Sequence, residues 1–138
     1  MRLFFWNLAR KSLADLIYAA IQLNDVDVAA FAEVDQLDFQ RLAELLDDHY
    51  QTVETIDGKV KTSMLVKRTI RWQEASAVVN NLTCTLNLDD IPVNISVVHL
   101  PDKRNDPLGH HRERTIQQLV SELNTIKKEA SVVCVTRG

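Results

Sequence analysis

Two short apolar runs, at residues 2–6 and 26–31, alternate with two stretches of helical periodicity in the first third of the chain. Polar residues bound both runs, a pattern typical of buried strands. The first helical stretch begins at Ser12, and Asp35 can cap the second. The positions predicted to face inward are Leu13, Leu16, Ile17, Ala20 and Ile21 in the first helix and Phe39, Leu42, Leu45 and Leu46 in the second. This order predicts a βαβ arrangement with the helices on one face of a sheet.

After residue 50 the apolar positions alternate, which is the period of a strand with one buried face. The pair Asp57-Gly58 predicts a hairpin turn between extended residues 51–56 and 60–66, and residues 70–79 are again extended. Two further segments alternate on either side of a turn at residues 89–92. Their apolar residues are Leu82, Cys84, Leu86 and Leu88 before the turn and Val93, Ile95 and Val97 after it. Together these segments predict an antiparallel meander.

A long helix and one more strand complete the pattern. After a polar loop at residues 101–109, apolar residues recur at helical spacing, and residues 131–135 then form a last apolar strand. The apolar positions of this helix are Ile116, Leu119, Val120, Leu123 and Ile126. The predicted fold class is α/β (α+β), a mixed sheet with helices on one face, in a single domain over residues 1–138.

Composition and charge narrow the function classes. The chain is 46% hydrophobic and 25% charged, as ordinary globular domains are, and its net charge of -3 provides no overall basic field to attract nucleic acid. The opening apolar run at residues 3–6 is too short for a signal peptide or a membrane span, so we expect a cytoplasmic protein. Cys84 and Cys134 are far apart with no CxxC motif, which favours two buried thiols over a disulfide or a metal site.

Three polar residues share one placement: Asn7, Glu33 and His99 each stand at or just beyond the C-terminal end of an apolar strand. Functional side chains gather at that edge of α/β sheets. Taken singly, the asparagine can be a turn residue, the glutamate a helix-cap partner and the histidine a buried rim residue. Taken together, a carboxylate and an amide oxygen suit Mg²⁺ or Mn²⁺, and a histidine can donate a hydrogen bond to a phosphoryl oxygen.

A basic segment follows the third of these residues. Arg112 and Arg114, beside His110-His111 and after Lys103-Arg104, can form a local phosphate-binding patch, with a solvated loop and helix start as the alternative. Trp6 and Trp72 lie within apolar strands, which favours packing over stacking on a nucleic-acid base.

Five segments carry a resemblance to a known family. They are the strand end Trp6-Asn7, DVAAFAEV at 27–34, SMLVKR at 63–68, VVHL at 97–100 and RERTIQQL at 112–119. In this order they resemble the N-terminal half of the endonuclease/exonuclease/phosphatase superfamily, the metal-dependent fold of pancreatic deoxyribonuclease. The resemblance covers essentially the whole chain. It implies half of a two-sheet sandwich with helices outside.

The resemblance also implies roles for the three strand-end residues. Asn7 would help hold the phosphate or a metal-bound water, Glu33 would ligate Mg²⁺ or Mn²⁺, and His99 would contact the scissile phosphate. The family continues with a Gly-Asp-x-Asn motif and a later Asp-His pair, which supply the general base and the rest of the phosphate clamp. This sequence ends at Gly138, where that motif would begin. The expectation is a C-terminally truncated domain with little turnover as a monomer.

The leading functional hypothesis is divalent-metal-dependent hydrolysis of a phosphodiester or phosphomonoester, with nucleic acid or a small phosphoester as substrate. The alternative is a truncated or degenerate domain that binds a partner or self-associates without catalysis. If only half of the sandwich is present, an apolar sheet face is exposed, and a homodimer could cover it. An incomplete gene product without a function of its own is a third possibility.

Overall fold

The computed structural model describes residues 1–53, 62–78, 81–101, 104–125 and 130–137. The predicted Asp57-Gly58 turn lies outside this part of the chain. The elements are, in order, β1 (Leu3–Asn7), α1 (Ala14–Asn24), β2 (Val28–Ala32), α2 (Gln36–Leu45), β3 (Tyr50–Thr52), β4 (Thr62–Lys67), β5 (Arg71–Val78), β6 (Asn81–Leu88), β7 (Ile91–Leu100), α3 (His110–Thr125) and β8 (Ala130–Arg137).

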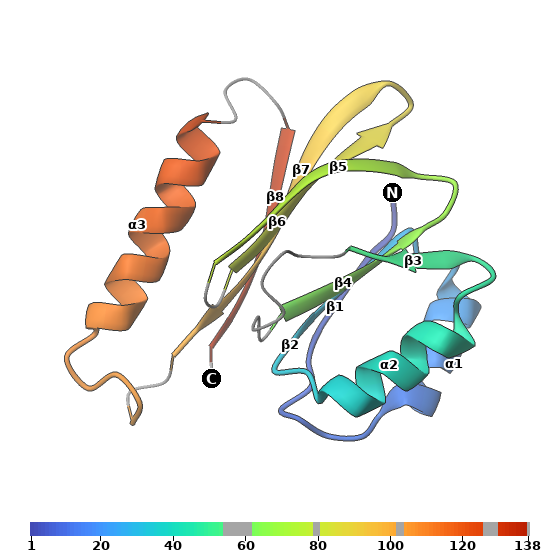
Figure 1. Ribbon diagram of the computed structural model, residues 1–138, viewed down its shortest axis with the longest axis horizontal. Helices are drawn as coiled ribbons and strands as arrows, with labels where there is room; N and C mark the ends of the chain where they lie inside the picture. Colours follow the sequence, from blue (N-terminus) through green and yellow to red (C-terminus); the bar gives the residue numbers. More distant parts are fainter. Residues whose placement is uncertain (54–61, 79–80, 102–103, 126–129, 138) are drawn as a thin grey trace.

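The strands form two four-stranded mixed sheets that face each other. The first has the order β1-β2-β4-β3 and the second β5-β6-β7-β8. Parallel pairs occur where a helix connects the strands, β1 with β2 and β7 with β8, and the other pairs are antiparallel. The helices α1 and α2 cover the outer side of the first sheet, and α3 lies beside the second (Figure 1). The predicted α/β class with mixed strand pairing is confirmed.

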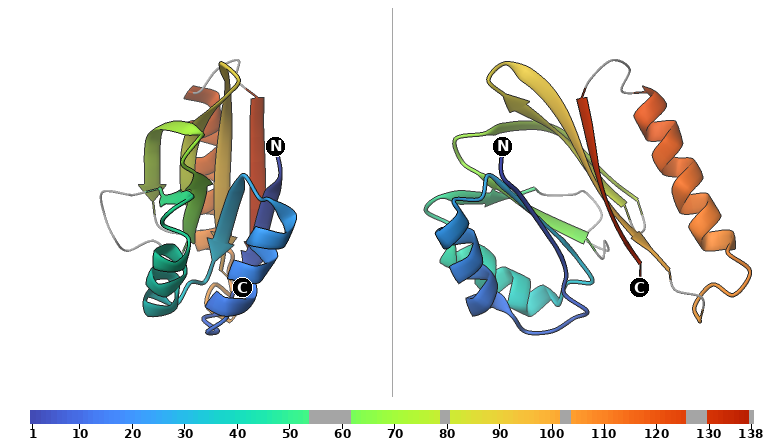
Figure 2. Two further views of the ribbon diagram at one scale, coloured as in Figure 1. Left: turned by 90° about the vertical axis from the view of Figure 1, so that its right-hand side faces the viewer. Right: turned by 180° about the vertical axis from the view of Figure 1, so that it is seen from behind.

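The inner faces of the two sheets bury each other, so the predicted exposed apolar sheet face is wrong. Val28, Ala30, Met64 and Val66 of the first sheet form one core with Leu82, Cys84, Leu86, Ile95 and Val97 of the second. All nine are fully buried. The chain passes from the first sheet to the second between β4 and β5, so the predicted meander is divided between two sheets that close on each other (Figure 2). The surface that motivated the homodimer is therefore covered within the chain.

The outer face of the first sheet packs under α1 and α2. The face of β2 that carries Ala29 and Phe31 forms one buried cluster with residues of both helices, namely Ile17, Ile21 and Leu42. Trp6 packs against this cluster, as predicted. The sequence pattern predicted too many buried positions on each helix, because Leu16 is 56% and Leu45 is 45% exposed. Each helix lies on one face of one sheet, so only the residues nearest that sheet are covered.

The backbone N–H at the start of α1 donates its hydrogen bond to the Asp38 carboxylate of α2, not to the Ser12 side chain. The N-cap of α1 is Leu13, whose backbone N–H donates to Asp38 Oδ2 at 2.9 Å, and the Ser12 hydroxyl donates to Asp38 Oδ1 at 2.8 Å. The predicted Ser12 cap is therefore wrong. The Asp35 cap is confirmed, because its carboxylate accepts the Asp38 N–H at 3.0 Å.

The second sheet has a polar outer face. The Thr83 and Ser96 hydroxyls are 2.8 Å apart, and Thr85 donates to Asn94 Oδ1 at 2.6 Å. The predicted inner stripe of α3 is only partly covered, since Ile116 is 47% and Val120 is 50% exposed. The Leu123 side chain and Ile126 lie outside the described residues.

Both cysteines are free and buried, as predicted. Burial raises the pKa of Cys84 to about 12 and raises that of Cys134 as well. Thiols this deep in the core are poor nucleophiles at neutral pH.

In the part of the chain that the structure describes, no helix is long and apolar enough to cross a membrane.

Candidate active site

Asn7, Glu33 and His99 meet at one edge of the sandwich. The parallel pair β1 and β2 is in register at Asn7 and Ala32, so Asn7 and Glu33, the residue directly after β2, lie side by side. The Asn7 Nδ2 amide donates to Glu33 Oε1 at 3.2 Å. His99 reaches the same carboxylate from the second sheet, with its Nε2 3.6 Å from Glu33 Oε1. The side chains of Asn7 and His99, from two strand ends, therefore both approach the carboxylate of Glu33 at a third strand end, as the shared placement predicted.

The backbone around Glu33 is held in an unusual conformation. Glu33 has φ 52°, and Ala9 and Arg10 in the loop after β1 have φ 47° and 58°. This left-handed region is costly for residues with a Cβ, and such strain gathers at functional sites. The loop after β1 is joined to the residue after β2 by a hydrogen bond, in which the Arg10 N–H donates to the Glu33 carbonyl at 2.8 Å. The Ala9 N–H also donates to Asn7 Oδ1 at 2.9 Å, which fixes the asparagine side chain.

His99 occupies the last inner-face position of β7. Ile95 and Val97 precede it with the same alternation and belong to the core between the sheets. The His99 side chain is buried, with its residue 5% exposed, whereas the Glu33 side chain is 23% exposed. The site therefore has a closed floor, formed by the histidine, and an open rim at the glutamate. A ligand would approach from the rim, where the charge is.

The donor atoms fit a divalent cation that keeps most of its water. Across the described ranges, no group of three or more His, Cys, Asp or Glu side chains is arranged so that it could hold a metal ion by itself. The Glu33 carboxylate is the anionic donor of the cluster, and Asn7 Oδ1 is occupied by a backbone N–H. Mg²⁺ is commonly held by one or two carboxylates, with water and substrate phosphate filling the other positions. The set therefore fits such a cation and does not form an all-protein cage.

Arg112 and Arg114 lie in the first two turns of α3, which follows the loop after the His99 strand. The backbone N–H groups of His111 and Arg112 donate to the two Asp106 carboxylate oxygens, at 3.2 and 2.9 Å, and Arg112 Nε is 3.5 Å from Asp106. Burial alone would raise the pKa of Asp106, but these N–H donors and the adjacent positive charges lower it. Arg112 is thus half-buried and held by Asp106, while Arg114 is exposed. Arg114 is the freer of the two to meet a phosphate.

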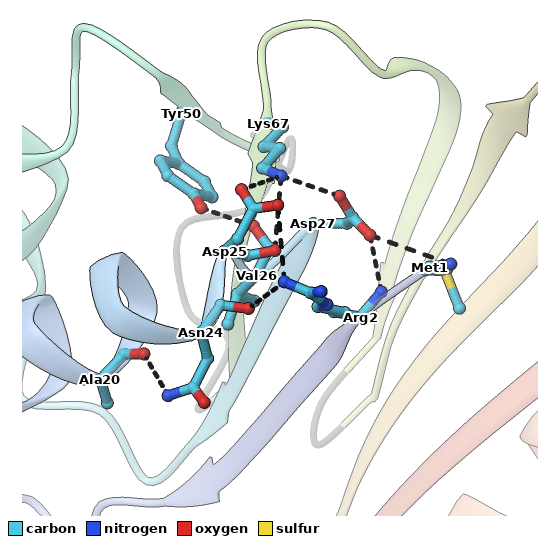
Figure 3. Close-up of polar contacts among 9 residues, drawn as sticks. All are labelled: Met1, Arg2, Ala20, Asn24, Asp25, Val26, Asp27, Tyr50 and Lys67. Carbon is cyan, nitrogen blue, oxygen red and sulfur yellow. Dashed lines mark hydrogen bonds and ion pairs between the residues drawn. The ribbon is translucent and has the colours of Figure 1, made fainter.

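A second charged cluster ties the opposite ends of β1 and β2 to β4 (Figure 3). Lys67 Nζ donates to Asp25 Oδ1 at 2.7 Å and to Asp27 Oδ1 at 3.0 Å. The Arg2 backbone N–H donates to Asp27 Oδ2 at 2.6 Å. Two cavities, of about 540 and 410 Å³, flank the neighbouring Tyr50. Asn7, Glu33 and His99 do not line these two cavities, so the cavities and the candidate chemistry are in different places.

This cluster makes stability depend on pH. Burial would raise the pKa of Asp27, but hydrogen bonds from Arg2 and Lys67 lower it below its ordinary 3.8. The hydrogen bond to Asp25 raises the pKa of Lys67 above its ordinary 10.5, against burial and with help from Asp27. The contribution of Asp27 is therefore complete above pH 3.8 and is lost as the pH falls through its folded pKa. The contribution of Lys67 is complete below pH 10.5 and is lost as the pH rises through its folded pKa.

We expect Lys67→Met to lower the free energy of unfolding by about 1–2 kcal/mol at pH 7, because two carboxylates lose their ammonium partner. Urea denaturation at pH 7 and pH 3 measures this. The difference from the unaltered chain should shrink at pH 3, because the contribution of Asp27 is complete only above its ordinary pKa of 3.8. An equal difference at both pH values would mean that the lysine stabilises by packing rather than by charge.

Comparisons with known proteins were made by sequence and by structure. No family model matches the chain, and no curated protein matches it by sequence. Solved structures do match. Humanized TDP2 from D. rerio aligns with a TM-score of 0.76 at 15% identity, over 98% of this chain and 60% of its own length. The human Nocturnin catalytic domain with bound sulfate aligns at 0.76 and 16% identity, over 98% and 62%. A β-hairpin deletion mutant of beta toxin from Staphylococcus aureus aligns at 0.75 and 13% identity, over 99% and 65%.

The chain thus spans about three fifths of the length of each of these proteins. At these identities the likeness concerns the fold, and it extends over nearly all of the present chain. It agrees with the two facing mixed sheets and the outer helices described above. The chain therefore has a deoxyribonuclease-I-like fold, as the sequence resemblance implied.

Proposed function

We propose that this chain carries the Asn7, Glu33 and His99 part of a divalent-metal-dependent phosphoesterase site. The observation that supports the proposal is that the Asn7 amide and the buried His99 ring both approach one oxygen of the Glu33 carboxylate, Oε1. This occurs at a sheet edge in a fold shared with TDP2, which one structure describes in complex with a single-stranded DNA product. Nucleic acid is accordingly the first substrate class to test, and a small phosphate ester the second.

Each of the three residues has a separate task in this proposal. Glu33 would hold Mg²⁺ or Mn²⁺, and Asn7 orients the glutamate through its amide N–H. His99, fixed by its buried position, would donate a hydrogen bond to a phosphoryl oxygen. The cation, when bound, would neutralise phosphate charge and polarise the phosphoryl group. Hydrolysis further needs a base for the attacking water, and we assign none of the three to that task. Binding is therefore the primary expectation, and turnover is secondary.

The direct test is metal-dependent hydrolysis of bis-p-nitrophenyl phosphate and of plasmid DNA by the 138-residue chain and its Glu33→Gln variant. Hydrolysis that requires Mg²⁺ or Mn²⁺ and is lost in the variant would support an enzyme. Metal and phosphate binding without hydrolysis would support the alternative of a non-catalytic binding domain. A chain that binds neither would contradict the proposal.

The arginines of α3 are proposed to add phosphate affinity. We expect Arg112→Ala combined with Arg114→Ala to weaken binding of a phosphate ester by about tenfold, because two cations are removed from the helix that follows the His99 strand. Calorimetric titration measures the affinity. Arg114→Ala alone should produce most of the loss, since Arg112 is held by Asp106. Unaltered affinity in the double variant would return both arginines to a structural role.

We also propose a cytoplasmic location. Two free, buried thiols are typical of proteins from a reducing compartment. Fluorescence microscopy of the tagged chain in its native host tests this.

A further inference from the structure

The Thr62 hydroxyl is a buried polar atom that has no hydrogen-bond partner among the described residues. The residue is 3% exposed. Burying a hydroxyl without a partner costs free energy, and such groups are few in native structures. Valine has nearly the same shape and would avoid this cost. A threonine at this position therefore needs an explanation other than packing.

Strand register places Thr62 beside the candidate site. Ala32 pairs with Asn7 on one side and with Thr62 on the other, so these three residues form one row across the first sheet. Residues in one row point to the same face. The next paired residues on the same face are Ala30, two residues before Ala32, and Met64, two residues after Thr62. Both belong to the core between the sheets. Thr62 and Asn7 therefore both face the second sheet, on opposite sides of β2, which Glu33 directly follows.

The second sheet reaches the same row. Because His99 Nε2 is 3.6 Å from Glu33, the end of β7 lies against the end of β2, where β4 begins with Thr62. The hydroxyl lies in buried surroundings. Hydrogen bonds to charged acceptors are strongest in such surroundings. The chemistry of the neighbouring residues points to an anionic acceptor with several oxygens.

We propose that Thr62 is a fourth residue of the site and that its hydroxyl donates a hydrogen bond to a nonbridging oxygen of the bound phosphate. This assignment rests on the proposed function. It gives each of three adjacent strands of the first sheet a polar group at the site edge: Asn7 on β1, Glu33 after β2 and Thr62 on β4. It also explains why the inner face of β4, otherwise apolar at Met64 and Val66, begins with a hydroxyl.

Two variants and one control test the assignment. Thr62→Val removes the hydroxyl and keeps the shape, whereas Thr62→Ser keeps the hydroxyl. The control is Thr83→Val, which removes an equally buried hydroxyl that is bonded to Ser96 on the outer face of the other sheet. Affinity for inorganic phosphate in the presence of Mg²⁺ is measured by calorimetric titration, and Tm by thermal denaturation.

We expect Thr62→Val to weaken phosphate binding by about tenfold or more, as the loss of a hydrogen bond to a charged group predicts. Its Tm should be equal to or higher than that of the unaltered chain, because a buried unpartnered hydroxyl is removed. Thr62→Ser should bind within about threefold of the unaltered chain. Thr83→Val should bind phosphate normally and have a lower Tm, since Ser96 loses its partner.

Unchanged phosphate affinity in Thr62→Val would overturn the assignment and leave the proposed function standing. A loss of binding in both Thr62→Val and Thr62→Ser would also overturn it, because the hydroxyl would not be the determinant. An unaltered chain that binds no phosphate would overturn the assignment together with the proposed function.

Discussion

Mn²⁺ is expected to stabilise the unaltered chain against thermal unfolding and to leave the Glu33→Gln variant unaffected. A ligand that binds only the folded state at a hundredfold excess over its Kd adds about 2.7 kcal/mol to the free energy of unfolding. Glu33 provides the anionic oxygen of the cluster, and glutamine has the same shape without the charge. The glutamine carbonyl can still accept the Asn7 amide N–H, so the local geometry should survive. The measurement is Tm as a function of Mn²⁺ and Mg²⁺ concentration.

Glu44→Gln is the matched control for this prediction. Glu44 lies on α2, where its carboxylate accepts a hydrogen bond from Gln40 on the helix surface. Its replacement removes one negative charge from the chain without touching the strand-end cluster. The control should keep the full metal-induced rise in Tm. An equal rise in Glu33→Gln would remove Glu33 from the metal site, and an equal loss in both variants would indicate unspecific attraction of the cation.

Asp38→Asn should lower the free energy of unfolding by about 2–3 kcal/mol, because the carboxylate holds two groups of another helix. Asp38 is 8% exposed and accepts from the Leu13 N–H and the Ser12 hydroxyl. An asparagine carries no negative charge, so both hydrogen bonds lose their charge assistance, and its N–H₂ group can meet the Ser12 hydroxyl only if that hydroxyl turns to accept. Urea denaturation at pH 7 measures the change. The effect exceeds that of an ordinary helix cap because the packing of α1 against α2 depends on the same side chain.

Asp35→Ala provides the comparison for Asp38→Asn. Asp35 caps α2 through a single hydrogen bond, and loss of such a cap costs about 1 kcal/mol. If the two variants are destabilised equally, Asp38 is no more than a surface acid near a helix start. If Asp38→Asn is clearly the worse of the two, its carboxylate connects the helices as described.

Local sequence patterns predicted the elements and the strand ends well. The apolar run before Asn7 and the run before Glu33 became β1 and β2, and the alternation that leads to His99 became β7. Each of these patterns depends on neighbours within a few residues, because periodicity reports which face of a segment is buried. The turn before β7 is a further example, since Asp89 and Asp90 both adopt the positive φ that a tight hairpin needs.

Local patterns were less informative about how much of each helix is covered. Leu16 and Leu45 have the spacing of core residues and are exposed, because the area that one sheet face covers is narrower than the apolar stripe. Serine is a typical N-cap residue, but the carboxylate that accepts the N–H at the start of α1 belongs to Asp38, on another helix. A capping pattern in the sequence cannot show that a distant acid competes for the same N–H.

What the sequence alone determined is the set of strands and helices, the strand-end positions of the three site residues and, through the family resemblance, the fold. The tertiary structure alone decided that the strands divide into two facing sheets, which brings His99 within 3.6 Å of Glu33 and places Thr62 in the same row as Asn7. The physical reason is that pairing between strands is a long-range choice. It depends on hydrogen bonds and buried area between segments far apart in the chain, and an alternating pattern indicates a buried face without naming what buries it.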